Sequence, residues 1–129
     1  MLGALGTRLG IEILEVSASR AVATMPVRGN TQPYGLLHGG ASIALAEHLG
    51  SVAAAAHAGP GRQALGIEVS ATHHRSAREG TVTGTAAAVH LGGSVATYDV
   101  VICDDAGRRL CSARVTCLLR EVRSRPPAP

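Results

Sequence analysis

Residues 36–58 constrain the fold more than any other part of the chain, because they form one long apolar segment. The segment follows a polar loop and ends at Gly59-Pro60-Gly61, a strong helix stop signal. We therefore predict a helix that begins between His38 and Gly40 and runs to this stop. Because its interior is apolar on nearly every face, we expect the rest of the protein to enclose it.

One carboxylate, that of Glu47, lies near the middle of the predicted helix, where an unpaired charge is costly to bury. At 100° per residue, Glu47 lies about 20° from Gly40 and about 40° from Ser51 around the helix axis. Free N–H groups at a glycine-rich helix start can bind an oxyanion, and a carboxylate can attack a carbonyl or activate water. This face therefore has the minimum equipment for acyl transfer.

The spacing along the helix also has a consequence. Gly39 and Glu47 are about 12 Å apart along the axis at 1.5 Å per residue, so one substrate carbonyl cannot contact both. If both act on one acyl centre, they come from antiparallel helices of two subunits, which predicts a two-fold dimer with shared active sites. The chain has 129 residues and neither Phe nor Trp, so its core is aliphatic and favours further burial at a subunit interface.

The remaining segments indicate a β-rich surround for the helix. Residues 10–28 are typical of two strands, and four more strands are expected after the helix, at 63–72, 81–91, 95–103 and 109–119. We predict a single α+β domain over residues 1–119, with an antiparallel sheet curled around one central helix. Residues 120–129 are polar and end in Pro-Pro-Ala-Pro, and we expect a disordered tail there.

Several classes of function are disfavoured by the sequence. The net charge of +3 comes without an arginine cluster or an aromatic ladder, which argues against nucleic-acid binding. The N-terminus does not resemble a signal peptide, and Glu47 and three histidines interrupt the apolar segment, so we expect a cytoplasmic protein without a membrane span. His73 and His74 are neighbours on a predicted strand and face opposite ways, which disfavours a metal pair.

A set of short motifs resembles the hotdog-fold thioesterases. The set comprises Gln32, His38-Gly39-Gly40, Glu47, Ser51 and the sequence His-Arg-Ser-Ala-Arg-Glu-Gly at 74–80. The nearest group is the PaaI-like branch, with the 1,4-dihydroxy-2-naphthoyl-CoA and aryl-carrier-protein proofreading thioesterases, and the resemblance covers about residues 10–119. It implies the hotdog fold, a dimer or a dimer of dimers (a homotetramer), and hydrolysis of acyl- or aryl-CoA thioesters or of carrier-protein thioesters. It also implies no metal and no cofactor other than the coenzyme A carried by the substrate.

The resemblance further assigns roles to individual positions. Glu47 would be the nucleophile or general base, and the Gly39 backbone N–H would polarise the thioester carbonyl. Gln32 and His38 would position the thioester, with His38 near the leaving sulfur, and Ser51 would hold the water or the substrate. The positions that match the coenzyme A site are Gly66, His73, His74, Arg75, Ser76, His90, Leu91, Gly92, Gly93, Ser94 and Val95.

Other interpretations of the same residues stay open at this point. Glu47 could be a structural carboxylate paired with an arginine across an interface, His38 a helix cap, and Ser51 a small residue at a helix contact. A hotdog dehydratase or hydratase would use a histidine and a carboxylate for proton transfer at carbon. A non-catalytic acyl-CoA-binding domain is the third possible function.

Overall fold

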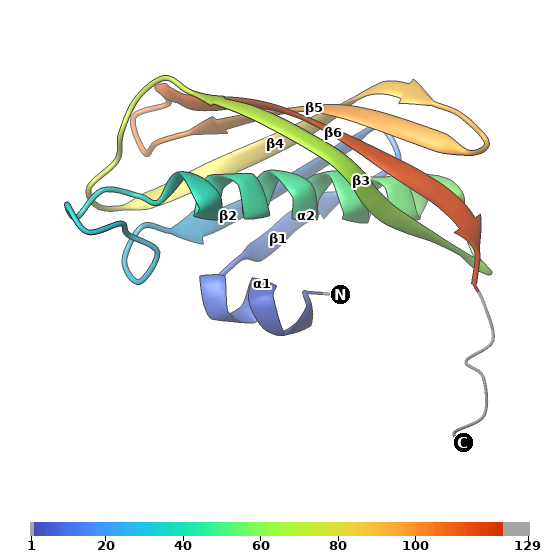
Figure 1. Cartoon of the computed structure of the whole chain (residues 1–129), viewed down its shortest axis with the longest axis horizontal. Coiled ribbons are helices and arrows are strands. Elements are labelled where there is room, and N and C mark those ends of the chain that lie inside the picture. The colour runs from blue at the N-terminus through green and yellow to red at the C-terminus, as the bar shows by residue number, and fades with distance from the viewer. Residues whose placement is uncertain (1, 123–129) are drawn as a thin grey trace.

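A six-stranded antiparallel sheet curls around one long helix (Figure 1). The computed structural model describes residues 2–122. In chain order the elements are α1 (Gly3–Leu9), β1 (Glu12–Val16), β2 (Arg20–Pro26), α2 (Gly39–Ala58), β3 (Arg62–His73), β4 (Thr81–Leu91), β5 (Val95–Cys103) and β6 (Arg109–Glu121). The strands lie in the order β1-β2-β4-β5-β6-β3, so β1 and β3 are the two edges. The predicted α+β arrangement is confirmed.

Helix α2 begins and ends where the sequence predicts. The His38 side chain caps its N-terminus, since the Gly40 N–H donates to His38 Nδ1 at 2.8 Å. At the C-terminus Gly59 has a φ of 80°, a conformation that favours glycine, and its N–H donates to the Ala55 carbonyl at 3.1 Å. The two caps fix the ends of a 20-residue helix.

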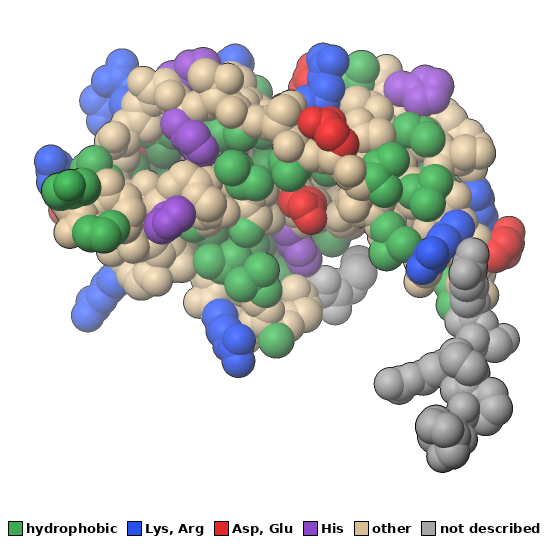
Figure 2. Space-filling model, viewed as in Figure 1, with side chains coloured by type: hydrophobic (Ala, Val, Ile, Leu, Met, Phe, Trp, Pro, Cys, Tyr) green, Lys and Arg blue, Asp and Glu red, His purple; other side chains and the backbone are tan. Residues whose placement is uncertain are grey.

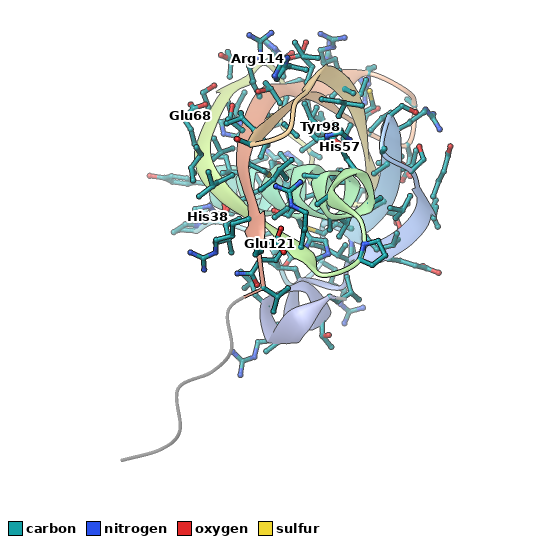
Figure 3. The ribbon with its side chains drawn as sticks, turned by 90° about the vertical axis from the view of Figure 1, so that its right-hand side faces the viewer. His38, His57, Glu68, Tyr98, Arg114 and Glu121 are labelled. Atoms are coloured by element: carbon teal, nitrogen blue, oxygen red, sulfur yellow. The ribbon has the colours of Figure 1, made fainter. Side chains whose placement is uncertain are left out.

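The core lies between α2 and the concave side of the sheet. Figure 3 shows this arrangement nearly along the axis of α2. It is aliphatic, as expected, with Leu45 and Leu49 of α2 fully buried against the strands. Tyr98 of β5 is also fully buried, and its hydroxyl donates to the Ala18 carbonyl at 2.7 Å. Burial raises the pKa of Tyr98 to about 12. This aromatic side chain therefore stays neutral inside the core.

Two predictions about the fold need correction, and one element is additional to those predicted. The additional element is helix α1, for which the sequence predicts no structure. The sheet encloses α2 on one side only, so several residues of this helix are exposed, Glu47 among them. Strand β6 continues to Glu121, because its end pairs with the start of β3, so Arg120 and Glu121 do not belong to a disordered tail. The rest of the expected tail, residues 123–129, lies outside the described residues. Within residues 2–122, no helix is long and apolar enough to cross a membrane.

Candidate functional site

The open face of α2 carries a groove that contains the predicted carboxylate. The groove has a volume of about 400 Å³ and is lined by Leu5, Gly40, Ile43, Ala44, Glu47, His48 and Ser51. The helical positions recur every three or four residues, which places them on one face of α2 as the sequence predicts. Figure 2 shows acidic and histidine side chains among hydrophobic ones on the side of the molecule toward the viewer. The Glu47 side chain is exposed in this groove, which Leu5 of α1 also lines.

The Glu47 side chain lies against Gly66 of β3. A Cβ atom on Gly66 would be 3.3 Å from both Cγ and Cδ of Glu47 and 3.4 Å from Oε1. The ion pairs within residues 2–122 use other carboxylates, so an intrachain arginine partner does not explain Glu47. The buried Cys117 of β6 lies behind Glu47 and Ser51. Burial raises the pKa of the Cys117 thiol, the Ser51 hydroxyl acts against this rise, and the Glu47 charge adds to it.

A second cavity, of about 240 Å³, opens at the N-terminus of α2, with Gln32, Gly39, Ser42 and His73 among its lining residues. The Gly39 N–H has no hydrogen-bond partner within residues 2–122, so it is free to donate to a ligand. Gln32 Oε1 accepts from the backbone N–H groups of Tyr34 and Leu36, which leaves its amide NH₂ available as a donor. The cavity thus has two donors that can face an oxyanion.

His38 lies beside this cavity as the cap of α2. Because its Nδ1 accepts from the Gly40 N–H, a neutral His38 carries its hydrogen on Nε2. The side chain is exposed, so this N–H can donate to a group outside the helix. His38 therefore caps α2, which is one of the roles that the sequence left open. This cap leaves Nε2 of His38 free for a ligand.

Within one chain, the structure does not bring the two halves of the predicted site together. Glu47 and Ser51 line the groove, while Gln32 and Gly39 line the cavity at the helix start, and the two sets share no residue. Both halves sit on α2 or next to its first turn, about 12 Å apart along the axis. A single chain has the donors and the base of an acyl-transfer site, but not at one carbonyl.

The predicted coenzyme A residues also divide into groups. The first includes His73, whose Nε2 would be 2.8 Å from a Cβ on Gly39, at the start of α2. His74 points away from it and bonds Ser112 at 2.9 Å. The residues at 90–95 span the end of β4, the turn and the start of β5, at the opposite end of α2, where His57 Nε2 lies 2.7 Å from the Gly92 carbonyl oxygen. The two groups therefore lie at opposite ends of α2, which is about 30 Å long.

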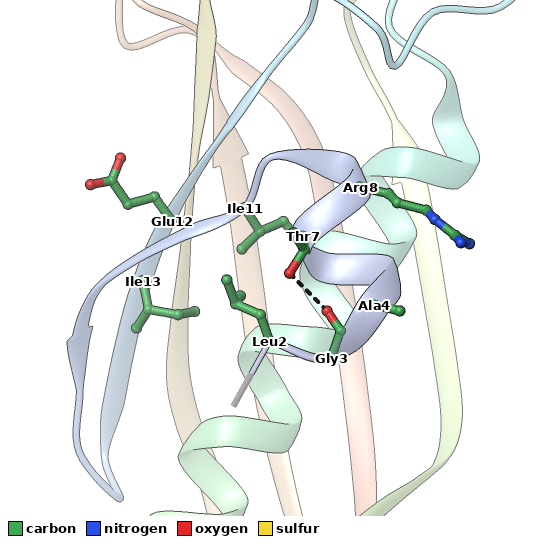
Figure 4. A pocket seen from close by; sticks show the side chains of 8 residues that line it. All are labelled: Leu2, Gly3, Ala4, Thr7, Arg8, Ile11, Glu12 and Ile13. Carbon is green, nitrogen blue, oxygen red and sulfur yellow. Dashed lines mark hydrogen bonds between the residues drawn. The ribbon is translucent and has the colours of Figure 1, made fainter.

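A larger cavity, of about 850 Å³, lies between α1 and the start of β1 (Figure 4). Its wall is mostly aliphatic and includes Leu2, Ile11 and Ile13, while the Thr7 hydroxyl donates to the Gly3 carbonyl at 3.0 Å. None of the predicted site residues lines it. No group of three or more His, Cys, Asp or Glu side chains within residues 2–122 is arranged to hold a metal ion.

Two features of the groove were missed by sequence reasoning. Leu5 reaches it from α1, a helix that the sequence did not reveal. Cys117 lies behind it because β6 pairs with β3 in a register that places Cys117 opposite Gly66. His48, expected as core or interface filler, packs toward Gly6 of α1, and burial lowers the pKa of its imidazole. The position of Cys117 behind the groove could have been identified only from the register of β6 against β3.

Comparisons with known proteins point to one family. A family model described as the thioesterase superfamily matches residues 34–111. The chain is 47% identical over 116 residues to the proofreading thioesterase EntH of Cronobacter sakazakii, which covers 89% of this chain and 80% of the relative. A thioesterase from Haemophilus influenzae superposes with a TM-score of 0.90 and 32% identity, over 97% of this chain and 88% of the other. A mutant thioesterase from Pseudomonas aeruginosa gives a TM-score of 0.88 and 38% identity, over 93% and 88%.

Proposed function

This chain belongs to the thioesterase superfamily and is a hotdog-fold thioester hydrolase, and we propose that it hydrolyses acyl-CoA thioesters, with a preference for aryl groups, in sites shared between two subunits. The main support for the proposal is that the candidate site is split into two parts along α2. The free N–H of Gly39 and the carboxylate of Glu47 lie on one helix, in separate cavities about 12 Å apart. Two antiparallel copies of α2 would bring each donor to the other subunit's carboxylate.

In the proposed reaction, Glu47 acts on the thioester carbonyl carbon, either by direct attack or by removing a proton from water. The Gly39 N–H and the Gln32 amide of the other subunit stabilise the charge that develops on the carbonyl oxygen. In the direct route, the C–S bond breaks to leave an acyl–Glu47 anhydride, which water then hydrolyses to the carboxylate and free Glu47. In the other route, the activated water attacks the carbonyl carbon and the C–S bond breaks to release the carboxylate. In both routes the sulfur takes a proton and leaves as the free thiol. His38 Nε2–H is suited to face that sulfur, and the Ser51 hydroxyl to hold the water.

The surface around Glu47 supports a subunit interface there. Strand β3 is an edge strand, and its exposed apolar side chains include Leu65 and Ile67, which are 38% and 58% exposed. An open strand edge next to an uncovered helix face favours association with a second copy. In an antiparallel pair, the β4–β5 turn of one subunit would lie beside His73 and Arg75 of the other. Both groups of predicted coenzyme A residues would then reach the same substrate.

The preference for aryl groups rests on the shape of the groove. Gly40 and Ala44 are small, so they leave room along α2 beside Glu47. Leu5 and Ile43 add apolar surface on which a ring can pack. The relative from Cronobacter sakazakii is named a proofreading thioesterase, which favours a thioester that a biosynthetic enzyme has loaded wrongly. Such a thioester could be carried by coenzyme A or by a carrier protein.

The proposal is tested by measuring thiol release from a panel of aryl- and alkyl-CoA thioesters, with enoyl- and 3-hydroxyacyl-CoA included. We expect turnover with release of free coenzyme A, fastest for the aryl thioesters. Hydration or dehydration of the enoyl and hydroxyacyl substrates without thiol release would instead identify a dehydratase. Tight binding of every thioester without turnover would identify a binding domain.

A further inference from the structure

Gly66 occupies a special position on β3, directly under the Glu47 carboxylate. A Cβ atom there would lie 3.3 Å from Cγ and Cδ of Glu47, tighter than nine in ten real Cβ contacts, so the Glu47 side chain would have to move by a few tenths of an ångström. No hydrogen bond or ion pair within residues 2–122 holds the Glu47 carboxylate. The bare backbone of Gly66 therefore leaves space that the Glu47 side chain occupies.

A β-bulge makes Gly66 face the helix. The pairing of β3 with β6 shifts between Gly66 and Glu68, so Ile67 is an extra residue in the strand. Before the bulge, Ala64 and Gly66 face α2, and after it Val69 and His73 do so. In a regular strand, residues seven apart point to opposite faces. The bulge therefore lets one strand place Gly66 under Glu47 and His73 against Gly39.

The layer behind this contact is buried and uncharged. Cys117 pairs with Gly66 in the sheet and is fully buried. Burial keeps the Cys117 thiol in its neutral form by raising its pKa, as described above. The neutral thiol carries no charge, and the ion pairs within residues 2–122 use other carboxylates, so no ion pair holds the Glu47 carboxylate in place. Steric fit against Gly66 has to provide this function instead.

We propose that Gly66 is a positioning residue for Glu47: its missing side chain, presented by the bulge at 66–68, leaves the space in which the carboxylate takes its reactive orientation. The inference rests on the proposed role of Glu47. It also differs from the expectation that Gly66 binds coenzyme A. A positioning residue acts on kcat through Glu47, whereas a residue that contacts coenzyme A acts mainly on KM.

The test is a double-mutant cycle with Gly66→Ala and Glu47→Ala, read as kcat and KM for thiol release. We expect Gly66→Ala to lower kcat about tenfold or more, since a misplaced catalytic group has effects of this size, with KM nearly unchanged. In the Glu47→Ala background the same change should have no further effect. A rise in KM at constant kcat, or an equal loss in both backgrounds, would overturn the proposal. Ser70→Ala, an exposed change on the same strand, is the matched control and should leave kcat as it is.

A crystal structure of the Gly66→Ala variant gives a readout that does not depend on activity. We expect the Glu47 side chain to turn away from β3 while the backbone stays in place. Gly66 is exposed on an edge strand and does not have a positive φ, so alanine is compatible with its backbone. An unmoved Glu47 would contradict the inference. Absence of thiol release by the unmodified protein would contradict the proposed function instead.

Discussion

Replacing Glu47 by alanine is expected to reduce thiol release by a hundredfold or more, or about 2.7 kcal/mol in the activation barrier. The carboxylate is the only acidic group that lines the groove on the open face of α2, among the residues that the structure describes. In the proposed reaction, its removal leaves the thioester polarised at Gly39 but without a nucleophile or base. Because Glu47 is exposed in the single chain, the fold should tolerate the change. The measurement is the steady-state rate with the best aryl-CoA substrate.

The matched control for this prediction is Glu68→Ala. Glu68 is also an exposed glutamate, and it lies on β3, the strand that follows α2. It comes after the bulge and lies near Arg114 on the outer surface (Figure 3). We expect this variant to hydrolyse thioesters at the rate of the unmodified protein. Equal rates for the Glu47 variant and this control would show that Glu47 does not take part in the reaction.

Replacing Leu49 by alanine is expected to lower the free energy of unfolding by about 3 kcal/mol. Leu49 is fully buried where α2 packs on the sheet, and a Cβ atom on Gly84 of β4 would be only 2.6 Å from its Cδ1. The helix and the strand therefore fit together as a large side chain against a glycine. Urea unfolding followed by circular dichroism measures the loss.

The same contact predicts that two destabilising changes partly compensate. Gly84→Ala alone should destabilise the protein through its clash with Leu49. In the Leu49→Ala variant that clash is absent, and the added methyl group fills part of the cavity. We expect the double variant to be more stable than the sum of the two single changes predicts. Strict additivity would mean that α2 does not pack on β4 at this point.

Much of the fold could be predicted because its signals are local. The stop at Gly59-Pro60-Gly61 and the glycines after His38 fixed the ends of α2, and the turns after the helix separated four strands close to their observed bounds. The predicted face of α2 with Gly40, Glu47 and Ser51 is also present. These features depend on residues that are near one another in the chain.

Features that depend on the whole molecule could not be predicted in the same way. Helix α1 has seven residues, two of them glycine, and no side-chain N-cap, so its local signals are weak. The apolar pattern of α2 indicates cover on every side but does not say whether the cover is the chain's own sheet or a second subunit. The contact between Gly66 and Glu47 depends on the β-bulge and on the register of β3, which no local pattern reveals.

The most direct test of a shared active site is the activity of mixed dimers made by co-expressing the Glu47→Ala and Gln32→Ala variants. Each variant alone should be nearly inactive, because every site lacks either the carboxylate or the amide donor. If the two groups come from different subunits, half of a random mixture pairs unlike variants, and one of the two sites in each such dimer is intact. We therefore expect about a quarter of the unmodified activity. Activity that stays at the level of the single variants would contradict it and place each site within one chain.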